Sequence, residues 1–298
     1  MTSLFCRHNR LTAKCPICSK EMEAELRAKA PPRPASVRRA KPAGSKAARA
    51  RRGGGGGMVT RRLARAADDG YRNQLVPGLR ATADAVRLAA ALLAAAERIE
   101  PPGPYEAVAT EPELEQATWL AFLLAVTGGQ ELQEALLAAS PRYEDGVPDG
   151  LPDGQARGVE AYLQWAERAG SQTAGFTGES DWSPERRFAR VFERLALPGF
   201  TRAARFDMLV GLGAAGLYDL QPDTLHVGAE DDATTAAAKR ALLSGDRMLL
   251  ERRARDLAQA CEVPLAALDR GLAWWDDASV ELDPLEEPPP AMRRALGL

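Results

Sequence analysis

The sequence predicts an all-α protein. Alanine and leucine dominate the 298 residues, aromatic residues make up only 6% of them, and the residue types that favour strands are scarce. Apolar residues recur at helical spacing between capping and breaking signals, and no segment has the pattern of a strand. The hydrophobic content of 45% is enough for a sizeable core. We therefore expect a folded body of about nine helices, without the internal repeat that would indicate a solenoid.

The clearest local pattern predicts two helices joined by a tight turn between Trp182 and Leu220. Ser183 and Thr201 are residue types that cap helices, and Pro198-Gly199 separates the two helices. The first helix has an apolar stripe at positions i, i+3, i+4 and i+7, formed by Phe188, Val191, Phe192 and Leu195. Because its arginines lie off this stripe, the hairpin is basic and suits contact with phosphate.

Seven further segments have helical periodicity between breakers. They are Leu79–Ile99, Glu113–Val126, Glu131–Ala139, Gly158–Ala169, Ala233–Leu243, Arg247–Cys261 and Pro264–Trp275. We expect residues 66–275 to form the folded body and residues 276–298 to form a flexible acidic tail. Cys261 lies on an apolar helix and is predicted to be a core thiol.

Charge divides the chain unevenly, although its net charge is only -2. Residues 1–65 hold 17 Lys and Arg against 3 Asp and Glu, a net charge of +14, so the rest carries -16. Residues 27–65 have 13 basic and no acidic residues and are predicted to be a disordered basic linker. The linker is either a binder of nucleic acid or a solvated tether, and Met58 within it is a possible internal start.

Two close pairs of metal-binding residues open the sequence. Cys6, His8, Cys15 and Cys18 form a C-x-H-x6-C-x2-C pattern, which supplies the four ligands that zinc takes in tetrahedral sites. The alternative is a set of free thiols beside an unrelated histidine. We predict a structural Zn²⁺ in a knuckle over residues 1–26.

Several classes of protein are disfavoured by what the sequence lacks. It has no apolar run long enough for a membrane span and no secretory signal, so we expect a cytoplasmic protein, with association with the nucleoid as an option. It also has no Gly-rich phosphate loop, no G-x-S-x-G and a single body histidine, His226. The remaining chemistry rests on carboxylates near cations: Asp207 with Arg205, and Asp232 with Lys239 and Arg240. For Asp232 the alternative is a helix cap, and for His226 a hydrogen bond within a loop.

The turn Leu197–Ala204, L-P-G-F-T-R-A-A, resembles the L-P-G-h-G-x-x-T-A hairpin of the helix-hairpin-helix DNA glycosylases. In that family the hairpin holds a DNA phosphate, and a catalytic aspartate follows a little more than twenty residues later. The chain departs from the pattern at Thr201 and Ala203. Two segments match the downstream aspartate, Asp223-Thr-Leu-His by spacing and Asp232-Ala-Thr-Thr by context, and we favour Asp232.

Over most of the body the sequence more closely resembles one branch of that superfamily, clade 3 of the α-glutamyl/putrescinyl thymine pyrophosphorylases. The resemblance is carried by W-S-P-E-R-R-F-A-R-V-F-E-R-L-A-L-P-G-F-T-R-A-A-R-F-D at Trp182 to Asp207, T-T-A-A-A-K-R at Thr234 to Arg240, G-D-R-M-L-L-E-R-R-A at Gly245 to Ala254 and V-P-L-A-A-L-D at Val263 to Asp269. It implies a helical glycosylase-like domain that acts on DNA.

The implied reaction displaces pyrophosphate from a pyrophosphorylated 5-hydroxymethyluracil in DNA by an amine or an amino acid. It requires cations around the pyrophosphate and an acceptor for the proton of the amine. The candidate catalytic residues are Asp232, Asp207, Lys239 and Arg240, and the candidate phosphate- and DNA-binding residues are Arg187, Gly199, Arg202 and Arg205. Trp182 and Phe188 are candidates for stacking on a flipped base, with core packing as the alternative. Alternative functions are a non-catalytic nucleic-acid-binding protein and a DNA glycosylase.

Overall fold

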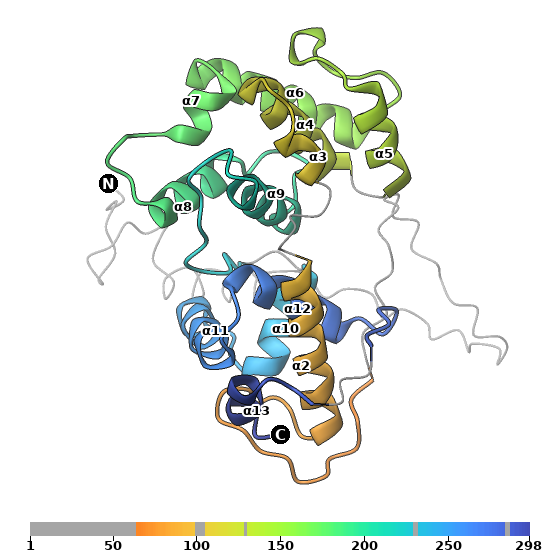
Figure 1. Ribbon diagram of the computed structural model, residues 1–298, viewed down its shortest axis with the longest axis vertical. Coiled ribbons are helices and arrows are strands. Elements are labelled where there is room, and N and C mark those ends of the chain that lie inside the picture. The colour runs from red at the N-terminus through yellow and green to blue at the C-terminus, as the bar shows by residue number, and fades with distance from the viewer. Residues whose placement is uncertain (1–63, 99–104, 128–129, 229–231, 284–286) are drawn as a thin grey trace, which may run out of the picture. The chain divides into compact units, whose positions relative to one another are not determined.

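A computed structural model describes residues 64–98, 105–127, 130–228, 232–283 and 287–298. All of them belong to the second of the two units into which the chain divides, residues 57–298. The predicted zinc ligands and nearly all of the basic linker lie outside the described residues. Within the described ranges the regular elements are all helices, as the composition predicts (Figure 1).

The described residues form two hydrophobic clusters, and we call the helices around each cluster a lobe. The first lobe contains α3 (Glu106–Ala109), α4 (Leu114–Thr127), α5 (Gln130–Ala139), α6 (Asp153–Ala169), α7 (Gln172–Thr177), α8 (Pro184–Arg194) and α9 (Arg202–Ala214), with a short 3-10 turn at Tyr143–Asp145. Helix α4 is buried on almost every side, which explains its apolar sequence. Its Phe122 stacks on Tyr162 of α6 with ring centroids 3.7 Å apart.

The second lobe joins a helix from early in the chain to four from its end. It contains α2 (Thr82–Glu97), α10 (Ala233–Leu242), α11 (Arg247–Cys261), α12 (Leu265–Asp276) and α13 (Pro290–Leu296). Helices α2 and α12 lie side by side (Figure 1). They pack closely at Gly271, where an added Cβ would lie 2.8 Å from a methyl group of Leu92. Cys261 is buried in this lobe, as predicted.

The predicted basic hairpin is present as α8, a turn and α9. The Ser183 hydroxyl accepts a hydrogen bond from the N–H of Arg186, and the Thr201 hydroxyl accepts one from the N–H of Ala204, so both predicted caps are formed. Gly199 in the turn has φ +74°, a left-handed conformation that favours glycine. The turn residues 198, 199 and 201 are exposed, which leaves this backbone accessible from solvent.

The structure differs from the sequence prediction at two places. The end of the predicted flexible tail forms α13, because Met292 and Leu296, one turn apart, bury their side chains completely in the second cluster. The segment before the hairpin, where no helix is predicted, contains α7, which is capped by Ser171 and buries Phe176. Within the described part of the chain, no helix combines the length and apolarity needed to cross a membrane.

Candidate functional site

A cavity of about 330 Å³ lies beside the hairpin turn and concentrates positive charge. We call it the arginine pocket; its lining residues are Phe192, Glu193, Ala196, Arg202, Arg205, His226, Gly228 and Arg247. Three guanidinium groups and one imidazole face one carboxylate. Guanidinium groups bind phosphate oxygens through paired, charge-assisted hydrogen bonds, so this lining suits a phosphate-type anion.

Arg202, the first residue of α9, joins the two lobes through buried ion pairs. Its side chain is only 2% exposed. The guanidinium binds both carboxylate oxygens of Asp269 in α12, at 2.9 and 3.2 Å, and its Nε lies 3.0 Å from Oδ1 of Asp232. Burial lowers the pKa of Arg202, but these two carboxylates more than offset that effect and raise it overall. The pocket wall is therefore a fixed positive charge held between two aspartates.

Asp269 is the more perturbed of the two carboxylates. Burial raises its pKa to about 6, and this effect exceeds the opposing attraction of Arg202. The negative charges of Asp207 and Asp232 raise the pKa further. Since two carboxylates share one guanidinium, a proton on Asp269 relieves the excess negative charge at mildly acid pH.

The segment after α9 brings His226 into the arginine pocket. Glu251 of α11 accepts hydrogen bonds from the backbone N–H groups of Leu225, at 2.8 Å, and Val227, at 2.7 Å. The Leu225 carbonyl accepts a third bond, 2.7 Å long, from Arg202. His226 lies between these anchors with φ +50°, a conformation that non-glycine residues seldom adopt. The surrounding bonds hold it there, as is typical of strained residues at functional sites.

The His226 ring is buried, and one nitrogen lacks a partner among the described residues. The ring stacks on Phe192, with centroids 4.3 Å apart, and its Nε2 accepts or donates no hydrogen bond there. Burial is the largest effect on its pKa, which falls to about 4. Arg247, Arg202 and Arg205 lower the pKa further, while Asp223 opposes them. The imidazole is therefore neutral at physiological pH.

The other two arginines of the pocket differ in exposure and in their contacts. The Arg205 guanidinium lies over the ring of Phe192, 4.5 Å from its centroid, and donates to the Phe192 carbonyl. Arg247, at the first position of α11, is exposed, and no ion-pair partner is seen for it in the described ranges. Arg247 is thus the cation of the pocket most available to a ligand.

Asp232 both caps α10 and contacts the wall of the arginine pocket. Its carboxylate accepts a hydrogen bond from the N–H of Thr235, 3.1 Å long, and another from the hydroxyl of the same residue. The side chain is 12% exposed and pairs with Arg202. The capping and the pairing occur together, so the cap does not exclude Asp232 from the site.

The remaining catalytic candidates lie elsewhere. Asp207 points away from Arg205 and pairs with Arg270 of α12, at 3.2 Å. Lys239 is exposed near the other end of α10. Arg240 pairs with Asp276 and lies over the ring of Trp275, 4.5 Å from its centroid. The structure therefore separates Lys239 and Arg240 from Asp232 by about two helical turns.

The remaining binding candidates have mainly structural contacts. Arg187 is buried and donates to three backbone carbonyls and to the carboxylate of Asp219. Phe188 is completely buried, and Trp182 is 6% exposed beneath the guanidinium groups of Arg186 and Arg194. Arg202 and Arg205 are the two binding candidates that the structure brings together, and Gly199 lies in the turn just before them.

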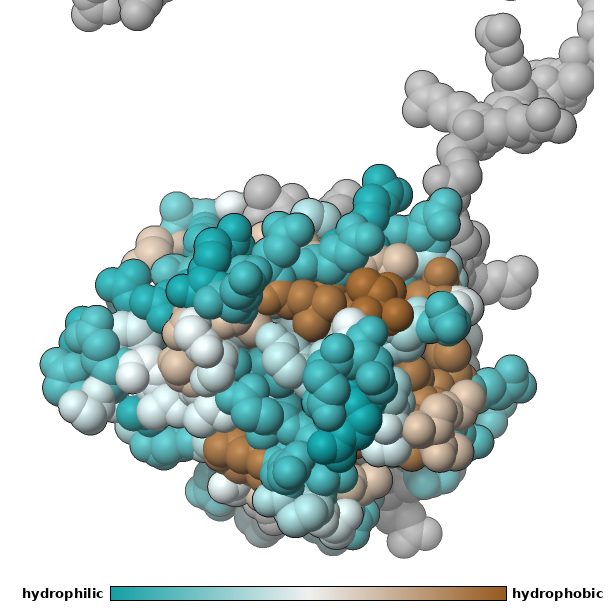
Figure 2. All heavy atoms as spheres, turned by 90° about the horizontal axis from the view of Figure 1, so that it is seen from above, coloured by the Kyte–Doolittle hydropathy of each residue, from teal (hydrophilic) through white to brown (hydrophobic). Residues whose placement is uncertain are grey.

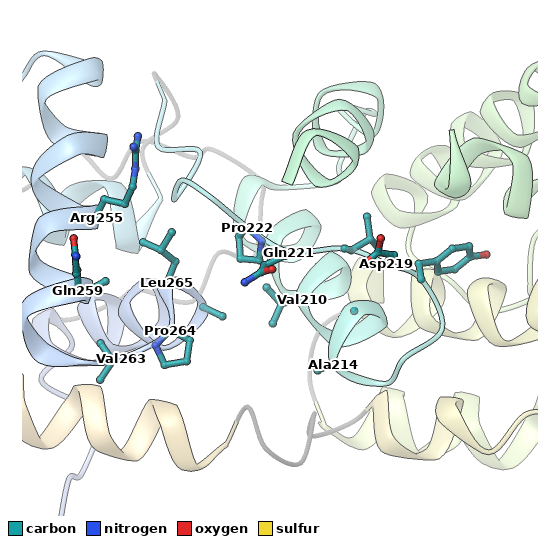
Figure 3. Close-up of a pocket in the computed structure, with 15 residues that line it drawn as sticks. Val210, Ala214, Asp219, Gln221, Pro222, Arg255, Gln259, Val263, Pro264 and Leu265 are labelled. Carbon is teal, nitrogen blue, oxygen red and sulfur yellow. The ribbon is translucent and has the colours of Figure 1, made fainter. Parts of the chain in front are cut away.

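A larger cavity, of about 540 Å³, separates the end of α9 from α11 and α12 (Figure 3). Val210 and Ala214 line one side, and Val263 to Ala266 line the other. Arg255 is its only cation, and it contains none of the candidate residues predicted from the sequence. Charge, and not size, distinguishes the arginine pocket. Among the described residues, no group of three or more His, Cys, Asp or Glu could hold a metal ion.

Comparison with known families identifies the region that contains the site. Residues 141–280 match the family described as alpha-glutamyl/putrescinyl thymine pyrophosphorylase clade 3. The match covers just under half of the chain. Comparison with curated proteins and with solved structures gives no match. Every residue of the arginine pocket, together with Asp207, Asp232 and Asp269, falls within the part that matches the thymine pyrophosphorylase family.

Sequence reasoning missed four residues of the site, namely His226 as a pocket residue, Arg247, Glu251 and Asp269. The weak signal for His226 was the Asp223-Thr-Leu-His segment, whose spacing after the hairpin matched a glycosylase pattern. Glu251 and Asp269 are acidic residues on buried helical faces, and a buried acid requires a partner. That rule signals that such residues have partners but does not identify them.

Proposed function

We propose that the protein is a DNA base-modifying transferase that displaces pyrophosphate from a pyrophosphorylated 5-hydroxymethyluracil in DNA with an amine or an amino acid. The single observation that carries this proposal is the arginine pocket, which lies within the part of the chain that matches the thymine pyrophosphorylase family. The leaving group is a multiply charged anion, and clustered guanidinium groups stabilise such a charge as it develops.

The reaction assigns one role to cations and another to a base. The amine nitrogen forms a bond to the methylene carbon on the thymine ring while the bond from that carbon to the pyrophosphate oxygen breaks. The electron pair of the broken bond leaves with pyrophosphate, and the nitrogen loses a proton to an acceptor. Arg202, Arg205 and Arg247 are assigned to the leaving group.

Asp232 is assigned as the proton acceptor. Its carboxylate contacts the guanidinium of Arg202, so a base at this position would be next to the group that receives the leaving anion. Asp207 remains the other candidate, because it is 44% exposed and pairs with only one cation among the described residues. We assign no stacking role to Phe188, which has no exposed surface.

The N-terminal residues complete the proposal. A zinc knuckle over residues 1–26 and the basic linker would hold the acidic body on DNA, because the linker carries the positive charge that the body lacks. The affinity of the full chain for DNA should then fall steeply with salt and drop on truncation to Met58. Metal analysis of the full chain should give one zinc, lost in a Cys15→Ser, Cys18→Ser variant.

The proposed activity is tested by release of pyrophosphate from duplex DNA that contains the pyrophosphorylated base, with putrescine as the amine. Asp232→Asn preserves a capping residue but removes the base, so release should fall about 100-fold or more. Asp256→Asn, at an exposed position of α11, is the matched control and should behave as wild type. DNA binding without release by the wild type would indicate a non-catalytic binder, and abasic sites would indicate a glycosylase.

A further inference from the structure

We infer that the arginine pocket takes up a proton when it binds a phosphate-type anion, and that His226 Nε2 is the atom that receives this proton and donates a hydrogen bond to the anion. The inference rests on the proposed function for the identity of the anion. The same chemistry fits two sources, a pyrophosphate group on the base and a phosphate of the DNA backbone.

The first support is the position of the ring. His226 is 8% exposed, lines the cavity, and keeps Nε2 buried with no hydrogen-bond partner among the described residues. A buried polar atom without a partner is costly, and a bound water, ion or ligand at the cavity would supply the missing partner. Glu251 binds the backbone N–H groups on both sides of His226, which holds this part of the loop in place.

The second support is the construction of the loop. A left-handed φ at His226 is maintained by two hydrogen bonds to one buried carboxylate, whose own pKa is raised by burial. Glu251 is 5% exposed, so it contributes these bonds in a setting where they are strong. The two bonds to Glu251 therefore hold His226 in a conformation that keeps its ring at the wall of the cavity.

The charges that face His226 determine the direction of the coupling. Arg202 and Arg205 come from α9, Arg247 from α11, Glu193 from α8 and Asp223 from the same loop. Glu251 binds the adjacent backbone, and Asp232 faces the ring only through Arg202. With the pocket empty, burial and the three arginines keep the imidazole neutral. A bound dianion neutralises the arginines and favours the imidazolium, so binding and protonation strengthen each other.

This coupling gives His226 a role in the proposed reaction. The imidazolium N–H points at an oxygen of the pyrophosphate when the bond between carbon and oxygen breaks. The proton can move to that oxygen as it receives the electron pair, which leaves neutral imidazole and a protonated pyrophosphate. Since neutral His226 binds the anion less well, the same proton transfer favours release of the product.

Calorimetric titration of the full chain tests the inference. The probes are sulfate, which does not titrate between pH 6 and 8, and inorganic pyrophosphate. Each is measured in two buffers of different ionisation enthalpy, so that the buffer dependence of the heat reports proton uptake. His226→Asn is the key variant because asparagine tolerates the left-handed backbone. Arg247→Ala removes a pocket cation, and Arg252→Ala, on the same helix but outside the pocket, is its control.

We expect sulfate affinity of the wild type to rise about tenfold from pH 8 to pH 6 with net proton uptake, as linkage requires. In His226→Asn both effects should disappear, whereas Arg247→Ala should weaken binding at least tenfold and Arg252→Ala less than twofold. Binding without proton uptake, or equal pH dependence in His226→Asn, would overturn the inference.

Two comparisons separate the inference from the proposed function. In the first, a duplex with unmodified thymine is added to compete with sulfate for the pocket. Displacement of sulfate by this duplex would identify the DNA backbone as the source of the anion, and no displacement would identify the pyrophosphate group. In the second, a protein that binds sulfate with proton uptake but releases no pyrophosphate from modified DNA would contradict the proposed reaction and support the inference on His226. Release of pyrophosphate without proton uptake on anion binding would support the reaction and contradict the inference.

Discussion

Two cavities of the body, the arginine pocket and the larger cavity beside α9, differ in charge more than their volumes suggest. The larger one, about 540 Å³, is lined by a single cation, Arg255, and a single carboxylate, Asp219. The arginine pocket, about 330 Å³, has three arginines, a strained histidine and a wall held by buried ion pairs. Buried charges cost free energy unless they are paired, and Arg202, Asp232 and Asp269 pair with one another at the wall of the arginine pocket.

The surface supports the same contrast. One face of the body is mostly hydrophilic, with a few separate hydrophobic areas (Figure 2). Among the described residues the large hydrophobic side chains that are exposed are Leu243, Met248 and Leu249. Met248, the most exposed of these side chains, lines neither cavity. The following predictions test this contrast, from the largest expected effect to the smallest.

The largest expected effect comes from removing the central cation. Arg202→Met preserves the length of the side chain but leaves Asp232 and Asp269 buried without their partner. We expect the free energy of unfolding to fall by about 3–5 kcal/mol. Arg255→Ala, which removes the exposed cation of the larger cavity, should change it by less than about 0.5 kcal/mol. Urea unfolding measures both, and equal small losses would contradict the central place of Arg202.

The next effect concerns pH and follows from His226. Its pKa is about 4 in the folded protein and near 6.5 when unfolded, so the unfolded chain binds more protons between these values. This group therefore makes the protein less stable as the pH falls from about 6.5 to 4. His226→Asn should remove about 2 kcal/mol of that loss at pH 4.5, measured by urea unfolding at pH 7 and 4.5.

Asp269 has the opposite sign in the same pH range. Its folded pKa of about 6 lies above the unfolded value, so the folded protein binds the extra proton and gains stability as the pH falls. The wild type should therefore respond weakly to mild acid, and His226→Asn should become more stable there. A variant as acid-sensitive as the wild type would mean that His226 does not titrate as described.

The smallest effect is expected in the larger cavity. Ala214→Trp adds a ring at an exposed position of its lining and reduces its volume. If the anion binds only in the arginine pocket, sulfate affinity should change by less than about twofold, or less than about 0.4 kcal/mol. A tenfold loss in this variant, seen by calorimetry, would move the binding site to the larger cavity.

The sequence predicted the helices better than it predicted the site. Caps at Ser183 and Thr201 and apolar spacing define the hairpin locally, so they can be recognised without a structure. The helix α13 was missed because its stability comes from burial of Met292 and Leu296 by helices far away in the sequence. Local periodicity carries no information about such contacts.

The arginine pocket is assembled by long-range contacts in the same way. Arg202 meets a carboxylate 67 residues away, and Glu251 reaches back 24 residues to the loop of His226. The sequence placed Arg202 and Arg205 on one predicted helix among several candidate cations. It selected Asp232 as an acid near Lys239 and Arg240, whereas the structure pairs Asp232 with Arg202. Sequence spacing could not show that the Arg187 guanidinium donates hydrogen bonds to backbone carbonyls, because those carbonyls come from separate segments of the chain.

The central claim is that the arginine pocket receives the pyrophosphate displaced from a modified thymine. The most direct measurement is single-turnover release of pyrophosphate from DNA containing the pyrophosphorylated base, by the wild type, Arg247→Ala and Arg255→Ala. We predict release by the wild type, a rate lower by about 10- to 100-fold in Arg247→Ala, and an unchanged rate in Arg255→Ala. An unchanged rate in Arg247→Ala, with or without a loss in Arg255→Ala, would contradict the claim.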